Sequence, residues 1–266
     1  MAPKVAVYTC AIGNRDWIHR AQVKPAGVDF IRFSDKRPAG RMMGWRHRTL
    51  PNIPDAKTAR VLSRFPKLRP HGVLDTYDVA VWIDASIEIM GDLTPLIRDF
   101  LDTGADVALF PHPSGRTVEE EFDFAIQSAR IGPEFYDIAA EQKARYGDMG
   151  LLNRKIVEAS IICYRLSSDA LQTAGQAWWH EVTHFTERDQ VSQPYAMQDP
   201  ALRIHLWDWH FKQNNPYFRR HPHRPKKLIW RMKTGAERLS DTRFEYRLVR
   251  YAIRGAARIK RALSRT

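Results

Sequence analysis

Short apolar runs, each ended by a polar or turn-forming residue, recur along the chain up to residue 207. Runs of this length that are rich in β-branched residues and bounded by Gly, Asn, Asp or Pro are typical of buried strands. The pattern predicts strands over residues 4–12, 29–35, 78–84, 106–111, 160–166 and 201–207.

Between these runs, apolar residues recur with the spacing of a helix that buries one face. This spacing predicts helices over residues 55–68, 117–146 and 168–184, the second interrupted at Gly132-Pro133 and the third capped by Ser167 or Ser168. Strands interleaved with helices of this length predict an α/β fold with a mostly parallel sheet flanked by helices.

The composition is that of a globular protein. The chain has 266 residues, of which 44% are hydrophobic and 27% charged, which excludes a disordered or fibrous protein. Its two cysteines, Cys10 and Cys163, lie in apolar runs, so we expect reduced core residues of a cytoplasmic protein. No secretory signal is visible and no apolar stretch approaches the roughly 20 residues that cross a bilayer, so we expect a soluble protein.

The positive charge is concentrated at the end of the chain. The formal net charge is +12, and from Pro216 onward 16 Lys and Arg residues stand against three acids. The rest of the chain is therefore close to neutral. We expect a catalytic or binding domain over residues 1–223 and a basic amphipathic helical tail over residues 224–266.

Within this tail, the arginines form one stripe of a helix with apolar residues opposite. Seven of them are spaced three or four residues apart: Arg243, Arg247, Arg250, Arg254, Arg258, Arg261 and Arg265. This pattern is typical of a helix lying on an anionic membrane, here over residues 237–266, which would place the protein peripherally at the inner face. Alternatively, the apolar face packs on the body and leaves the arginines in water. Nucleic acid is disfavoured, since no recognised binding motif accompanies the charge.

Asp84 is the sharpest candidate for chemistry in the body. It ends an apolar strand and is followed by Ala85 and Ser86, at the edge of the sheet where α/β proteins bind ligands. A carboxylate there suits Mg²⁺ or Mn²⁺ bridging the phosphates of a nucleotide. The alternative is that Asp84 only caps the turn after the strand.

A second candidate is the tripeptide Arg188-Asp189-Gln190. A cation, an anion and an amide side by side can bind sugar hydroxyls, and the carboxylate can act as a general base. The alternative is that Asp189 caps a helix and its neighbours are solvated.

Several short motifs, in this order, resemble a glycosyltransferase-like family shared by plants and bacteria, which includes plant mucilage-related proteins. The resemblance spans about residues 5–223. Its motifs are Tyr8-Thr-x-x-Ile-Gly-Asn14, Phe33-Ser-Asp35, Arg60 with Arg64-Phe-Pro-Lys67, Pro70-His71, Trp82-Ile-Asp-Ala-Ser86, His112-Pro113, Trp178-Trp179 and Arg188-Asp-Gln-x-Ser192.

The resemblance implies a Rossmann-like GT-A fold that uses a nucleotide-sugar donor, with a UDP-sugar favoured. Asp84 would face a divalent cation, Mn²⁺ or Mg²⁺, and the donor, although Ser86 replaces the second acid of the usual Asp-x-Asp and puts metal dependence in question. Other donor-binding positions follow from the motifs: Thr9 and Asp35 at the nucleoside, and Arg60, Arg64 and Lys67 at the diphosphate. For these three cations, a solvated basic helix face is the alternative.

The resemblance also implies roles around the transferred sugar. Asp189 would act there as a base or orient the sugar, together with Arg188 and Gln190. His112 and Trp179 would lie on the acceptor or sugar side. A late histidine often completes the metal site of such enzymes, and His221 or His223, within a segment that resembles the family's closing motif, would take that place.

The function expected from this resemblance is sugar transfer from a nucleotide-sugar to a glycan or lipid-linked acceptor, in the synthesis of a surface polysaccharide. Two alternatives remain. One is a metal-dependent hydrolase using Asp84 and histidines. The other is a protein without catalytic activity that binds glycan or nucleic acid.

Overall fold

A computed structural model describes residues 2–13, 18–36 and 43–221 of the chain. Within these ranges the strands form one sheet of seven and a separate ribbon of two. The strands are β1 Val5–Cys10, β2 Val28–Ser34, β3 Arg46–Thr49, β4 Val79–Ile83, β5 Ile87–Ile89, β6 Val107–Pro111, β7 Val157–Arg165, β8 Ile204–Leu206 and β9 Phe218–Arg220.

The helices lie between the strands, as the alternating pattern predicts. They are α1 Ala59–Leu68, α2 Thr94–Asp102, α3 Val118–Gln127, α4 Tyr136–Asp148, α5 Asp169–His184 and α6 Asp189–Ala196, with short 3-10 turns at Pro70–Gly72 and Pro133–Phe135. Helix α5 begins where its Ser168 cap accepts a hydrogen bond from the Leu171 amide. The predicted break at Gly132-Pro133 separates α3 from α4 and is confirmed.

The large sheet has the strand order β3-β2-β1-β4-β7-β6-β8. Strand β1 pairs in parallel with β2 and β4, β2 with β3, and β6 with β8. Strand β7 is antiparallel to both β4 and β6. The predicted α/β fold with a mostly parallel sheet is therefore confirmed.

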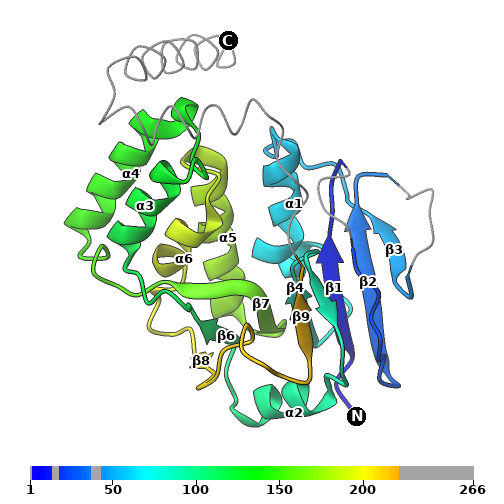
Figure 1. Cartoon of the computed structure of the whole chain (residues 1–266). Coiled ribbons are helices and arrows are strands. Elements are labelled where there is room, and N and C mark those ends of the chain that lie inside the picture. The colour runs from blue at the N-terminus through cyan, green and yellow to red at the C-terminus, as the bar shows by residue number, and fades with distance from the viewer. Residues whose placement is uncertain (1, 14–17, 37–42, 222–266) are drawn as a thin grey trace.

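Helices cover both faces of this sheet (Figure 1). One face carries α1 and α5, whose Phe65 and Trp178 pack with Tyr8 and Trp82 of the sheet. The other face carries α2, whose Phe100 packs with Val81 among others. Helices α3, α4 and α6 build a third apolar cluster beside the sheet (Figure 1).

Several elements were not predicted from the sequence. Strand β3 is largely polar and only partly buried, and β5 and β9 have three residues each. Helix α2 and helix α6 were also missed, and the last predicted strand is shorter than expected, at Ile204–Leu206. Cys10 and Cys163 are buried and unpaired, as expected for core residues.

The topology brings the predicted strand-end residues, Thr9, Asp35, Asp84 and His112, to one edge of the sheet. Strands β1, β2, β4 and β6 all end there, and antiparallel β7 begins there, so that the Asp84 amide bonds to the Ser160 carbonyl at 2.8 Å. His223 and the predicted tail, residues 224–266, lie outside the described residues. None of the described helices has the length and hydropathy needed to cross a bilayer.

Candidate functional site

Asp84 follows the last residue of β4 and is partly buried. Its Oδ1 accepts a hydrogen bond from the Trp82 indole nitrogen at 2.8 Å, whereas the turn itself is closed by the Ile87 amide on the Asp84 carbonyl. Burial raises the pKa of Asp84, while the charges of Lys67 and Arg64 oppose this rise. Among the described residues, no side-chain hydrogen bond thus supports the alternative of a turn cap, since the Asp84 carboxylate bonds to Trp82.

Asp189 is the first residue of α6, where a carboxylate faces the positive end of the helix dipole. It is 3% exposed and lies 2.5 Å from the Lys67 ammonium and 3.3 Å from Nε of Arg64. Burial alone would raise its pKa, but Arg64, Lys67 and Arg188 outweigh burial and hold the pKa far below the usual range. A carboxylate with so little proton affinity is a poor general base, which argues against that predicted role.

Lys67 and Arg64 form ion pairs with Asp189 and also act electrostatically on Asp84. Lys67 and Arg64 act on the pKa of both acids, and the charge of Asp189 itself raises the pKa of Asp84. Because these two acids come from β4 and α6, the fold brings them together from positions far apart in the sequence. The mutual charge effect agrees with two acids that lie near each other, and a pocket shared by both stays a prediction.

The basic face of α1 is turned toward the protein. Lys67 is 3% exposed, and its ammonium also lies 5.8 Å from the centre of the Trp178 ring. Arg60 donates to the Arg130 carbonyl at 2.9 Å, and burial lowers the pKa of Arg60 to about 10. The alternative of a solvated basic face is therefore wrong.

Arg188 is held by a buried glutamate. Its Nη2 lies 2.8 Å from Glu121, which is 0% exposed and also accepts a bond from Nε of Arg116 at 2.9 Å. Its neighbour Glu120 instead closes a capping box with Thr117 at the start of α3. The direct ion-pair partner of Arg188 is thus Glu121.

The Gln190 side chain connects helix α6 to the sheet through a hydrogen bond. Its side-chain nitrogen donates to the Val157 carbonyl at the start of β7, and the residue is buried. Trp179 is a core residue, contrary to the predicted sugar contact, because its ring packs edge-on against Phe65 at 5.0 Å and is 6% exposed.

Three donor-site candidates lie at the expected edge. Thr9, near the end of β1, is 1% exposed, and its hydroxyl has no hydrogen-bond partner among the described residues. Asp35 follows β2 and accepts a long bond from the Gly13 amide, which joins the ends of β1 and β2. Ser86 is buried, and its carbonyl accepts from the His221 amide at 2.8 Å.

His112 follows β6 on the same edge. Its Nδ1 accepts from the Ser114 amide at 3.3 Å and lies 2.7 Å from the Ser114 hydroxyl, an arrangement that favours the tautomer with the ring proton on Nε2. Burial lowers its pKa to about 4, although the charge of Glu158 acts in the opposite direction. His112 is therefore a neutral hydrogen-bond donor near pH 7.

Glu158 was missed by the sequence reasoning. It lies at the start of β7, is 5% exposed, accepts from the Ser160 hydroxyl at 2.5 Å and pairs with Lys212. Despite burial, these partners lower its pKa. The available signal was a single acid within an apolar strand, but the partner Lys212 lies far along the chain.

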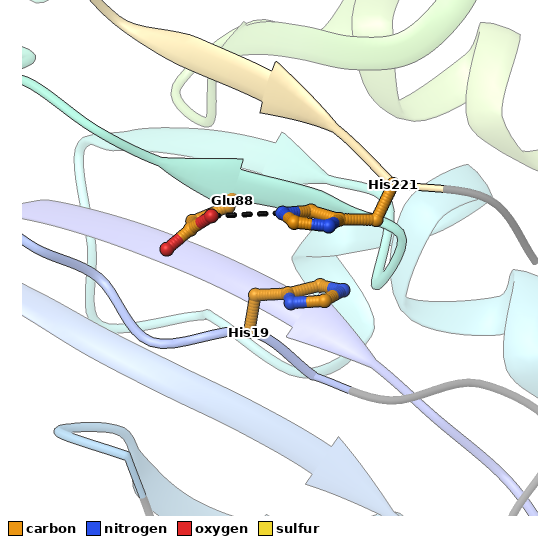
Figure 2. A group of neighbouring side chains, drawn as sticks. All are labelled: His19, Glu88 and His221. Carbon is orange, nitrogen blue, oxygen red and sulfur yellow. Dashed lines mark hydrogen bonds and ion pairs between the residues drawn. The ribbon is translucent and has the colours of Figure 1, made fainter.

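A second cluster joins His19, Glu88 and His221 (Figure 2). One ligand atom of each lies within 4.8 Å of the others, and this is the only such group of three among the residues that the structure describes. His221 bonds to Glu88 at 2.8 Å and stacks on His19 with ring centres 3.8 Å apart. Burial lowers the pKa of His19, and His221 lowers it further.

The three-ligand group contains one of the predicted metal ligands, His221. His221 groups with His19 and Glu88, which were not predicted, and Asp84 belongs to no three-ligand group in the described part of the chain. The charges that face Asp84 are those of Lys67 and Arg64. The predicted pairing of Asp84 with His221 around one cation stays a prediction.

The sequence matches the family model described as "TOD1/MUCI70, glycosyltransferase-like domain" over residues 32–214. The chain belongs to this family. The resemblance identified from the motifs is confirmed, and the described body of the protein is a TOD1/MUCI70 glycosyltransferase-like domain. No curated protein matches the chain.

Solved structures similar to this TOD1/MUCI70 domain include two fungal mannosyltransferase-type proteins. One is the mannosyltransferase Ktr4p from S. cerevisiae, with 10% identity, a TM-score of 0.44, and coverage of 77% of this chain and 68% of that chain. The other is core-mannan synthase A (CmsA/Ktr4) from Aspergillus fumigatus in its Mn/GDP form, with 10% identity, a TM-score of 0.46, and coverage of 77% and 73%.

Proposed function

We propose that this domain is a GT-A-type glycosyltransferase that moves a sugar from a nucleotide-sugar donor to a glycan or lipid-linked acceptor. The observation that carries the proposal is the shared electrostatic environment of Asp84 and Asp189 at the carboxyl edge of the sheet. Open α/β sheets bind ligands at this edge, and the family membership assigns a glycosyltransferase-like domain to the same residues.

The cations around these acids suit a diphosphate leaving group. Six cations interact electrostatically with four carboxylates, Asp84, Glu121, Glu187 and Asp189; the cations are Arg60, Arg64, Lys67, Arg116, Arg130 and Arg188. The excess positive charge favours a ligand that gains negative charge as the glycosidic bond to the nucleotide breaks.

The two acids have different roles in this proposal. Asp189 is a positioning residue, because it fixes the directions of the Lys67 ammonium and the Arg64 guanidinium while buried itself. Asp84 is more exposed, and among the described residues its side chain accepts one hydrogen bond, from Trp82, so it is available to accept another from a donor hydroxyl. Thr9 and Asp35 then border the nucleoside, and His112 offers its Nε2 proton to a sugar oxygen.

The divalent cation that the family resemblance implies fits one set of residues in the described chain. His19, Glu88 and His221 would hold it, since two imidazoles and a carboxylate are metal-binding groups. Bound there, it would supply positive charge near Ser86, whose carbonyl accepts a hydrogen bond from the His221 amide. The preference for a UDP-sugar and the role in surface polysaccharide synthesis stay predictions.

Donor binding is tested by thermal unfolding of the full chain with UDP-, GDP- and CMP-sugars. A donor at 100 times its dissociation constant stabilises the folded state by about 2.7 kcal/mol. We expect one donor class to stabilise the wild type and Asp78→Asn but not Asp84→Asn. Asp78 is the matched control, because it is an exposed acid immediately before β4, at the opposite edge of the sheet. Stabilisation of Asp84→Asn equal to that of the wild type would contradict the assignment of Asp84.

A further inference from the structure

Three segments of the chain place His19, Glu88 and His221 side by side. His19 lies after β1 in a stretch without regular structure, Glu88 is the middle residue of β5, and His221 directly follows β9 (Figure 2). The antiparallel pairing of β5 with β9 sets Glu88 opposite Arg219, two residues before His221.

Backbone hydrogen bonds fix each of these segments independently of the cluster. The His221 amide bonds to the Ser86 carbonyl at 2.8 Å, and the Gln22 amide bonds to the Ile89 carbonyl at 2.9 Å. The Trp45 indole donates to the His19 carbonyl at 2.8 Å. The backbone that carries the three side chains is therefore held in place by hydrogen bonds in which these side chains take no part.

A fourth residue orients the carboxylate. The Gln22 side chain donates to Oε1 of Glu88 at 2.7 Å, which leaves Oε2 directed at Nε2 of His221. A ligand whose second oxygen is held by a neighbouring side chain is a recurring feature of metal sites, because the neighbour fixes the direction of the ligand.

We propose that His19, Glu88 and His221 form a binding site for a divalent ion of the first transition row, with preference for Zn²⁺ and Mn²⁺ over Mg²⁺. Two imidazole nitrogens and one carboxylate oxygen are a common donor set for Zn²⁺ and related ions, whereas Mg²⁺ prefers oxygen ligands throughout. Affinity rises from Mn²⁺ to Zn²⁺ at such sites, so Zn²⁺ binds more tightly.

Binding requires a local rearrangement of the side chains. The two rings are stacked with an angle of 15° between their planes, so their in-plane nitrogen lone pairs do not meet at one point. One ring must rotate, and Glu88 must exchange its bond to His221 for a bond to the ion. Both changes involve side chains alone, since the backbone bonds described above do not depend on them.

The site is tested by calorimetric titration of the chelator-treated full chain with Zn²⁺, Mn²⁺ and Mg²⁺. Ion binding is measured without a nucleotide-sugar, so a failure here leaves the proposed transfer activity standing. We expect one Zn²⁺ per chain, weaker Mn²⁺ binding and no detectable Mg²⁺ binding. His19→Gln and Glu88→Gln should abolish tight Zn²⁺ binding, and Gln22→Ala should weaken it by about 10- to 100-fold.

His184→Gln is the matched control. His180 and His184 form another stacked pair, exposed on α5, with ring centres 4.1 Å apart. Tight binding should persist in His184→Gln, and each variant should match the thermal midpoint of the wild type in chelator, which shows that it is folded. The proposal is overturned by no Zn²⁺ binding to the wild type, by unchanged affinity in His19→Gln and Glu88→Gln, or by loss of binding in His184→Gln.

Discussion

At the scale of single residues, the centre of the site is a buried carboxylate that holds two cations. Asp189 is 3% exposed and Lys67 is equally buried, so each depends on the other for compensation of its charge. Removing one partner of a buried ion pair costs more than the pair itself contributes, because the remaining charge is left without compensation. Asp189 therefore links the stability of the fold to the geometry of the site.

Asp189→Asn should lower the free energy of unfolding by about 3–5 kcal/mol, because Lys67 then stays buried without its ion-pair partner. Urea denaturation measures the loss. Adding Lys67→Met to this variant should cost less than the sum of the two single changes, since neither charge is then left alone. The exposed pair of Lys143 with Asp123 is the control, and Asp123→Asn should cost at most about 1 kcal/mol. Additive costs for Asp189 and Lys67 would contradict the coupling.

His112 should make stability depend on pH. Its folded pKa is lowered to about 4 by burial, whereas a histidine in the unfolded chain has a pKa of about 6.5. Between these values the unfolded state binds the proton and the folded state does not, so stability falls as the pH drops from about 6.5 to about 4.

This prediction is checked by measuring the free energy of unfolding at several pH values. In His112→Gln the slope between pH 6.5 and 4 should be smaller than in the wild type, because the titrating group is gone. An identical slope in both proteins would assign the dependence to other residues.

Several residues of the candidate site could be predicted from the sequence, but the residues with which they form ion pairs could not. Asp84 and Asp189 are visible in the sequence because each stands next to a recognisable apolar or aromatic stretch. The partner of Arg188 could not be predicted, since Glu121 lies 67 positions away and only the packing of α3 on α6 joins them. The predicted sugar contact of Trp179 was wrong because the sequence pattern is ambiguous. Two adjacent tryptophans are equally typical of a sugar-binding surface and of a helix that packs in the core.

At the scale of elements, helix α1 presents Arg64 and Lys67 to the site, and helix α5 holds α1 in place. The contact is close at Gly175, where a Cβ atom would lie 2.5 Å from the Leu68 carbonyl oxygen. The absence of a side chain at this position lets α5 approach the end of α1.

Gly175→Ala should therefore destabilise the protein by about 1–3 kcal/mol, because backbone atoms must move to admit the methyl group. Gly147→Ala in α4 is the matched control. There the nearest atom is Leu152 Cδ1 at 3.4 Å, and the change should be neutral or stabilise by up to about 1 kcal/mol. Thermal or urea unfolding compares the two variants, and equal stability in both would show that α5 does not constrain α1.

The elements that were predicted have strong local patterns, and those that were missed do not. Strand β4, Val79–Ile83, is buried throughout and reads as a strand without its neighbours. Strand β3 is polar and pairs only with β2, and the ribbon of β5 and β9 depends on residues more than 120 positions apart. The antiparallel direction of β7 cannot be predicted from its apolar residues, because the direction of a strand depends on the loops and helices that connect it to its neighbours and not on residue spacing.

At the scale of the whole molecule, charge is distributed unevenly along the chain. The formal net charge is +12, and the 16 Lys and Arg residues from Pro216 onward account for the excess. Through this basic tail we propose a contact with anionic membranes, on the arginine stripe described above.

Removing residues 237–266 should abolish sedimentation of the protein with anionic liposomes and leave the thermal midpoint of the body unchanged. Each Lys or Arg near such a surface contributes about 1 kcal/mol, so added salt should also weaken binding of the full chain. Neutral liposomes serve as the control. Sedimentation of the truncated chain to the same extent as the full chain would reject the membrane contact.

The central claim is that Asp84 belongs to the donor site of a sugar-transfer reaction. The most direct measurement is release of nucleoside diphosphate or monophosphate from a panel of nucleotide-sugars, with glycan and lipid-linked acceptors, by the wild type, Asp84→Asn and Asp78→Asn. We predict release by the wild type and Asp78→Asn, and a rate at least about 100-fold lower for Asp84→Asn. No release with any donor, or equal rates for Asp84→Asn and the wild type, would contradict the account.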